Sequence, residues 1–135
     1  KRTDNSTPII PKIELDKTFK RKVKKASALS LDELKSRASK SQTKPGSRIA
    51  TTTTYQRDPN VVSYTLKRVN GVCELCEQPA PFKKKNGEPY LEVHHVIQLA
   101  HGGEDTIDNA VALCPNCHRK MHSLSLKSDL IKLTK

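Results

Sequence analysis

The 135-residue sequence has little material for a hydrophobic core. Only 34% of its residues are hydrophobic, 4% are aromatic, and it contains no tryptophan. A chain so poor in apolar residues usually needs disulfide bonds or a structural metal to stabilise its fold. No run is apolar enough to cross a bilayer or to act as a signal peptide, which argues against a membrane protein. The composition favours a small stapled domain, and its four cysteines could provide either kind of staple.

Acidic residues are also few, and the imbalance is uneven. The net charge is +11, and residues 1–50 contribute +9 of it, from 14 Lys and Arg against 5 Asp and Glu. Such a charge is typical of a protein that binds a polyanion. A basic segment can serve solubility alone, but attraction to nucleic-acid phosphates is the favoured interpretation here.

The N-terminal part, residues 1–54, is predicted to be a basic connector or tail of largely irregular structure. One short helix is expected inside it, because Ser30 and Glu33 form a capping box ahead of a small apolar edge. The stretch 39–54 has no hydrophobic periodicity and contains a Pro-Gly turn signal, so it is predicted to be a linker.

Residues 55–135 are predicted to form a small α+β domain. Asp58 and Pro59 indicate the start of a helix over about 58–69. Alternation and β-propensity predict strands at 90–93 and 111–113, and Pro115 opens a second helix to about residue 124. The expected order is helix, strand, loop, strand and helix.

The four cysteines form two C-x-x-C pairs, separated by thirty-seven residues: Cys73, Cys76, Cys114 and Cys117. Two such pairs can offer four thiolates to one tetrahedral zinc ion. Disulfide bonds are the alternative, and the absence of a secretion signal favours zinc. A structural zinc here would clamp the two ends of the strand-loop-strand segment together.

Four of the five histidines lie in two clusters inside and beside this clamp. His94 and His95 are neighbours on a predicted strand, so their side chains point to opposite faces and serve different purposes. His118 and His122 are four residues apart on the last helix and share a face. This arrangement permits a second metal, held by His118, with or without His122, and by one histidine of the strand pair, while the other remains free to act as a base. The alternative is that these histidines are ordinary surface or hydrogen-bonded residues.

The run LEVHHVIQLAHGGEDTIDNAVALCPNCHRKMH, in which HH, N and CxxCH follow in order, resembles the motif of HNH endonucleases. Residues 55–122 as a whole are similar to the C-terminal nuclease domain of McrA-type restriction enzymes, which cut modified DNA. The resemblance implies a ββα-metal (His-Me finger) fold, stapled by the four-cysteine zinc site and preceded by a helix.

The resemblance also implies a role for each motif residue. His95 corresponds to the general base that deprotonates water, and Asn109 to the central asparagine that braces the loop and orients that base. His94 and His118 correspond to ligands of a catalytic metal, and His122, by analogy with the nuclease colicins, to a further ligand. A histidine at position 94, where many relatives have aspartate, shifts the preference from Mg²⁺ toward Mn²⁺, Co²⁺, Ni²⁺ or Zn²⁺.

Three further residues are weaker candidates. Arg119 and Lys120 follow His118 and are candidates for contacts with DNA phosphates, although a solvated helix face explains them equally well. Glu92 lies two residues before His94, on the same strand face, and could support a metal ligand.

The function that these features imply is metal-dependent hydrolysis of phosphodiester bonds in DNA, most simply double-stranded DNA, by a restriction-type enzyme of the bacterial cytoplasm. It would use structural Zn²⁺ and one catalytic divalent ion, and cleavage of both strands by a single-site nuclease favours a homodimer. Two alternatives remain open. One is a zinc-stapled module that binds DNA without cutting it, and the other is an HNH nuclease of a mobile element, phage or toxin.

Overall fold

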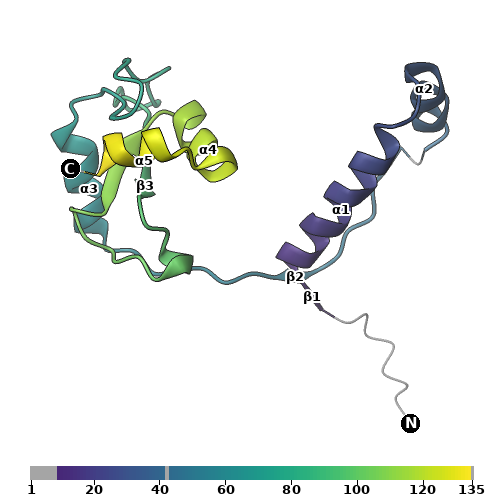
Figure 1. Cartoon of the computed structure of the whole chain (residues 1–135), viewed down its shortest axis with the longest axis horizontal. Coiled ribbons are helices and arrows are strands. Elements are labelled where there is room, and N and C mark those ends of the chain that lie inside the picture. The colour runs from purple at the N-terminus through teal and green to yellow at the C-terminus, as the bar shows by residue number, and fades with distance from the viewer. Residues whose placement is uncertain (1–8, 42, 135) are drawn as a thin grey trace, which may run out of the picture. The chain divides into compact units, whose positions relative to one another are not determined.

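The computed structural model describes residues 9–41 and 43–134. The chain divides into two compact units, Lys1–Thr54 and Tyr55–Lys135, which are described one at a time (Figure 1). Residues 1–8 of the predicted basic connector, residue 42 and residue 135 of the predicted nuclease domain lie outside the described residues. In the described part of the chain, no helix is both long and apolar enough to cross a membrane.

The first unit contains the helix predicted after Ser30 and a longer helix that was not predicted. Helix α2 spans Leu31–Ser39, and the Ser30 hydroxyl accepts from the backbone N–H of Glu33 at 3.2 Å. The Glu33 carboxylate pairs with Arg37 at 3.2 Å. Helix α1 spans Lys12–Ala26, and its first residue follows β1 (Ile10–Pro11), which pairs in parallel with β2 (Ala50–Thr51).

The expectation of a largely irregular segment was therefore wrong for residues 12–26. Helix α1 begins after Pro11, which provides no side-chain cap, so the sequence carries no start signal there. The helix is instead favoured by Lys and Arg, which are good helix formers, and by an i,i+4 pair between Lys12 and Asp16 at 2.7 Å. Leu15, Phe19 and Val23 recur every four residues along α1, a helical pattern that was not used for the prediction, although no residue of the helix is buried.

The second unit begins with helix α3 (Pro59–Arg68), as predicted. The Asp58 side chain caps it by accepting from the backbone N–H of Asn60 at 2.8 Å. The chain leaves the helix through two residues with positive φ, Asn70 at 48° and Gly71 at 82°. A side chain at Gly71 would also meet Pro89 at 3.0 Å, so glycine suits this turn for two reasons.

Two strands form the sheet of this unit. Strands β3 (Glu92–His95) and β4 (Ala110–Leu113) pair antiparallel, with Glu92 opposite Leu113 and His95 opposite Ala110. The first strand was predicted two residues too early. Tyr90 does not pair with β4: its N–H donates to Phe82 O at 2.9 Å and its ring stacks on Phe82, with ring centroids 4.6 Å apart.

Helix α4 (Pro115–Leu124) follows β4 as predicted, and a 3-10 turn, η1 (Leu99–His101), lies in the loop between the strands. A further helix, α5 (Lys127–Leu133), was not predicted, and Leu126 ahead of it provides no side-chain cap. The larger core cluster combines buried side chains from α4, α5, β4 and the segment around Cys73, among them Leu113, Met121 and Leu133. Two of the cysteines, Cys73 and Cys117, belong to this core.

Candidate metal centres and active site

The four cysteine sulfurs converge on one point. All four Sγ atoms lie within 4.8 Å of one another, and Cys76 Sγ is 3.9 Å from Cys114 Sγ. Four sulfurs around one zinc ion at about 2.3 Å lie about 3.8 Å apart along the edges of the tetrahedron. The sulfur positions therefore fit a tetrahedral structural zinc site.

The protein surroundings do not favour the deprotonation of all four thiols in the absence of a cation. Burial raises the pKa of Cys73, but backbone hydrogen bonds from Cys114, Cys76 and Leu75 outweigh it and lower the pKa to about 7. The pKa of Cys117 is raised, first by burial and then by its cysteine neighbours. A divalent cation would relieve this conflict, because metal binding deprotonates thiols outright.

Three histidines form a second cluster on one side of the sheet. His94 comes from β3, and His118 and His122 from successive turns of α4; one ligand atom from each lies within 4.8 Å of the others. His118 Nε2 and His122 Nε2 are 3.1 Å apart. Nitrogens bound to one ion at 2.0–2.1 Å are about 3.3 Å apart in a tetrahedral site. The donor set thus fits a divalent ion with an affinity for imidazole.

Desolvation favours the neutral form of two of these histidines, His94 and His122. Desolvation, followed by the charges of His118, His122 and His95, lowers the pKa of His94 to about 4. Desolvation also lowers the pKa of His122, with smaller contributions from His118 and Arg119. Because neutral imidazole is the form that binds metals, both side chains are ready for coordination at neutral pH.

Glu92 lies directly against one of the three histidines. Its Oε1 is 2.9 Å from His118 Nδ1, and its Oε2 accepts from the Tyr90 hydroxyl at 2.7 Å. The hydrogen bond from Tyr90 and that from His118 lower the pKa of Glu92, so it is a carboxylate. A carboxylate only accepts, so His118 carries a hydrogen on Nδ1; in the neutral imidazole the Nε2 that faces His122 is then unprotonated.

His95 points away from this cluster, as the strand alternation predicts. Its Nε2 is 2.8 Å from Asp105 Oδ1, and the other oxygen of Asp105 accepts from the backbone N–H of Asp58 at 2.6 Å. His95 is 7% exposed and Asp105 is 20% exposed. The N–H of Asp58, followed by His95, lowers the pKa of Asp105. Asp105 was not predicted, because it lies in a loop with no periodicity, ten residues after its partner.

Asn109 closes the loop between the strands. Its Oδ1 accepts from the N–H of Ile97 at 2.9 Å, and its Nδ2 donates to Ile97 O at 2.9 Å and to Glu104 O at 2.8 Å. Its backbone carbonyl also accepts from Val96 N at 2.8 Å. These four bonds bring both ends of the loop together next to His95.

A pocket of about 310 Å³ joins the two groups of histidines. Four of the residues that line it are His94, His95, His118 and His122. Its lining also includes Tyr55 and Arg57, which precede α3 and were not predicted. The guanidinium of Arg57 is close enough to help lower the pKa of Asp105. A polyanion that entered this pocket would therefore meet four imidazoles and one permanent cation.

The two basic residues predicted beside His118 differ in their surroundings. Lys120 Nζ is 3.2 Å from Asp129 Oδ2 and joins α4 to α5, which favours a structural role. Arg119 is exposed and forms no ion pair with any residue that the structure describes. Of the two, Lys120 is therefore the one already engaged by a carboxylate.

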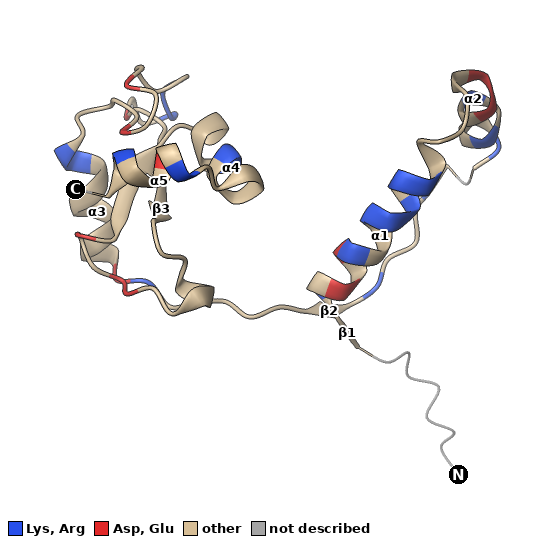
Figure 2. Ribbon diagram, viewed as in Figure 1, with Lys and Arg blue, Asp and Glu red and all other residues tan. Residues whose placement is uncertain are grey.

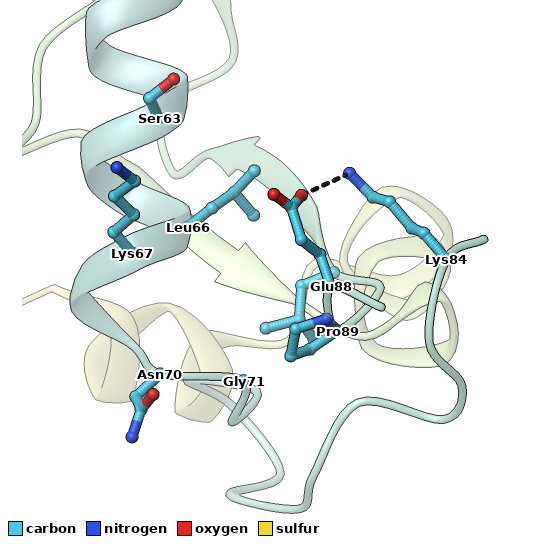
Figure 3. Close-up of a pocket in the computed structure, with 9 residues that line it drawn as sticks. Ser63, Leu66, Lys67, Asn70, Gly71, Lys84, Glu88 and Pro89 are labelled. Atoms are coloured by element: carbon cyan, nitrogen blue, oxygen red, sulfur yellow. Dashed lines mark ion pairs between the residues drawn. The ribbon is translucent and has the colours of Figure 1, made fainter. Parts of the chain in front are cut away.

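A second hollow, of about 340 Å³, lies between α3 and the segment 84–91 (Figure 3). Lys84 and Glu88 approach each other at its rim, with 3.8 Å between Nζ and Oε2. None of the cysteines or histidines line it. The chemistry is therefore concentrated in the smaller pocket.

Comparison with known proteins agrees with this geometry. Residues 73–124, which include both cysteine pairs and the four clustered histidines, match the family model described as HNH endonuclease. The matched segment belongs to a small α+β unit with a four-cysteine cluster at zinc-binding distance.

Two relatives and one solved structure are similar to part of the chain. The chain is 53% identical over 79 residues to the type IV methyl-directed restriction enzyme EcoKMcrA of Escherichia coli (strain K12); these residues are 58% of this chain and 28% of that enzyme. It is 46% identical over 37 residues to anaredoxin of Nostoc sp., which covers 27% of this chain and 49% of that protein. The structure of the type IV phosphorothioation-dependent restriction endonuclease ScoMcrA is similar, with a TM-score of 0.49 and 36% identity over 58% of this chain and 15% of that one. The chain thus spans little more than a quarter of the restriction enzyme EcoKMcrA.

Proposed function

We propose that this protein is a metal-dependent DNA endonuclease in which His95 is the general base. One observation carries the proposal: His95 and the cluster of His94, His118 and His122 line the same pocket, while each group is held by a different carboxylate. A protein that only grips DNA has no need of a buried imidazole beside a set of metal ligands.

His95 takes a proton from the water molecule that attacks the phosphorus in line. The bond between phosphorus and the 3′ oxygen breaks, this oxygen takes up a proton, and the products have 3′-hydroxyl and 5′-phosphate ends. The histidine must be neutral to do so. Asn109 contributes by holding the loop that carries Asp105.

His94, His118 and His122 would hold the catalytic divalent ion, and the Glu92 carboxylate would orient His118. When bound, the ion supplies charge stabilisation to the scissile phosphate and its leaving 3′ oxygen. Three imidazoles favour Mn²⁺, Co²⁺, Ni²⁺ or Zn²⁺ over Mg²⁺. Cys73, Cys76, Cys114 and Cys117 would hold a structural Zn²⁺.

We also propose where DNA phosphates contact the chain. Arg57 in the pocket and Arg119 on α4 are placed to hold phosphates next to the scissile one. In the first unit, Figure 2 shows Lys and Arg repeated along α1, and this helix is a further surface for the DNA backbone.

The similarity to EcoKMcrA supports a restriction-type role, in which modified double-stranded DNA of the bacterial cytoplasm is the substrate and a homodimer cuts both strands. The proposal is tested by incubating zinc-loaded protein with supercoiled plasmid from methylating and non-methylating hosts. Each reaction contains Mg²⁺, Mn²⁺, Co²⁺, Ni²⁺ or EDTA.

Two variants accompany the wild type: His95→Ala, and His101→Ala as the matched control at an exposed position of η1. We expect the wild type and His101→Ala to nick plasmid with at least one metal, and His95→Ala to be slower by about 10²–10⁴-fold. If the wild type shifts DNA on a gel but never cuts it, the protein is a binding module and the role of His95 is wrong.

A further inference from the structure

The contacts of Asp105 carry an inference about how the base is prepared. We propose that Asp105 is a positioning residue which fixes His95 in the tautomer with its hydrogen on Nε2. We also propose that the backbone N–H of Asp58, by binding the other carboxylate oxygen, fixes the orientation of the Asp105 side chain. The inference rests on the proposed function for its catalytic meaning, but the placement of the hydrogen is a property of the folded chain alone.

Asp105 makes one hydrogen bond with each of its carboxylate oxygens. Oδ1 lies 2.8 Å from His95 Nε2, and Oδ2 lies 2.6 Å from the backbone nitrogen of Asp58. The imidazole is 7% exposed, so water competes little for this contact. The carboxylate therefore bridges the base on β3 and the N-cap residue of α3.

This geometry selects one tautomer of His95. A carboxylate has no hydrogen to donate, so a short contact with Nε2 requires that Nε2 carries the hydrogen. In a neutral imidazole the other nitrogen, Nδ1, is then the proton acceptor. His95 would consequently accept the proton of water through Nδ1, and Asp105 would stabilise the imidazolium that forms.

The Asp58 N–H makes the assignment sharply testable, because it is an obligatory donor. In an Asp105→Asn variant, the amide oxygen must face this N–H, since the opposite orientation would place two donors 2.6 Å apart. The amide NH₂ group then faces His95 Nε2 and requires an unprotonated nitrogen there. The variant is isosteric, retains both hydrogen bonds, and moves the hydrogen of His95 to Nδ1, where it blocks the base.

The test reads the tautomer directly. Long-range ¹H–¹⁵N correlation spectra of ¹⁵N-labelled full-length protein, loaded with one equivalent of zinc and held at a pH well above the imidazole pKa of about 6.5, distinguish protonated from unprotonated ring nitrogens. We expect His95 to carry its hydrogen on Nε2 in the wild type and on Nδ1 in Asp105→Asn. Asp108→Asn, an exposed change in the same loop, serves as the control and keeps the wild-type tautomer.

A hydrogen on Nδ1 in the wild type would overturn the proposal without any variant, and so would an unchanged tautomer in Asp105→Asn. In the plasmid assay, Asp105→Asn should nick about 10²–10⁴-fold more slowly than the wild type. Equal nicking by the two proteins contradicts the role of Asp105 and leaves the proposed nuclease intact. A tautomer that switches in a protein that never cuts DNA contradicts the nuclease and leaves the placement of the hydrogen by Asp105 intact.

Discussion

Two carboxylates hold the histidines of this site by different ring nitrogens. Glu92 contacts Nδ1 of His118, which leaves Nε2 for a metal, whereas Asp105 contacts Nε2 of His95, which leaves Nδ1 as the acceptor. In the proposed function, the position of the carboxylate thus decides whether a histidine serves as a metal ligand or as the general base.

Replacing Glu92 with glutamine should weaken metal binding by the histidine cluster about 10–100-fold. The tautomer of His118 need not change, because the Tyr90 hydroxyl can accept from the amide NH₂ group, but the negative charge that strengthens the Nδ1–H bond is removed. Isothermal titration of zinc-loaded protein with Co²⁺ or Mn²⁺ measures the change. Glu104→Gln, an exposed change in the loop, is the control, and an equal affinity in both variants would contradict the role of Glu92.

For single residues, the sequence predicts which way a side chain points better than it predicts which residue that side chain contacts. Alternation along a strand is a local rule, so the separation of His94 from His95 and the shared face of His118 and His122 could be predicted. The contact between His95 and Asp105 depends on the path of an irregular loop, which no local rule describes. Arg57 was missed for the same reason, because it lies ahead of α3 and reaches the pocket only through the fold.

At the scale of elements, α5 contacts the segment of the first cysteine pair and helix α4, and so stabilises the cysteine site. The Lys132 ammonium donates to Leu75 O at 2.6 Å, next to the first cysteine pair, and Lys120 of α4 pairs with Asp129 of α5 at 3.2 Å. Leu133 completes the packing, since it is 7% exposed and belongs to the larger core cluster. In a chain with so few apolar residues, one buried leucine is a substantial part of the core.

Leu133→Ala should therefore lower the free energy of unfolding by about 2–5 kcal/mol, the range for a buried leucine truncated to alanine. The matched control is Ile131→Ala on the same helix, where the side chain is 65% exposed and the expected change is within about 0.5 kcal/mol. Urea unfolding of the zinc-loaded proteins measures both. Equal effects of the two substitutions would show that α5 does not pack on the core.

The predicted and the missed elements differ in their start signals. Helices α3 and α4 begin with a capping residue followed by proline, Asp58-Pro59 and Cys114-Pro115, and both were predicted. Helices α1 and α5 begin after Pro11 and Leu126, which form no side-chain cap, and both were missed. Strand β3 was shifted because pairing with β4, not β-propensity, determines where it starts.

At the scale of the whole molecule, charge and chemistry belong to different parts of the chain. Residues 1–50 carry a net charge of +9, whereas the cysteines and the clustered histidines all lie beyond residue 72. In α1 the positive charge is concentrated toward the C-terminal end, where Lys20 to Lys25 include five basic residues and no acidic one. A helix with no buried residue has its charged side chains free to contact phosphates.

The last prediction concerns this helix and separates a specific surface from the effect of net charge. Two variants each remove four positive charges within residues 9–41: one changes to glutamine the residues Lys20, Arg21, Lys24 and Lys25, and the other Lys12, Lys17, Arg37 and Lys40. If the end of α1 binds DNA, only the first variant has a lower affinity, and its plot of log K against log salt becomes shallower by about 0.9 for each phosphate that the helix no longer neutralises.

Fluorescence anisotropy with labelled duplex DNA over a range of salt concentrations gives both slopes. Equally reduced affinities in the two variants would mean that the first unit acts through its net charge alone. Unchanged slopes in both would mean that none of the changed residues contacts DNA, which would contradict the binding of DNA by α1 and leave Arg57 and Arg119 as the proposed phosphate contacts. Because neither variant alters the second unit, nicking of plasmid at low salt should continue in both, which keeps DNA binding by α1 distinct from chemistry at His95.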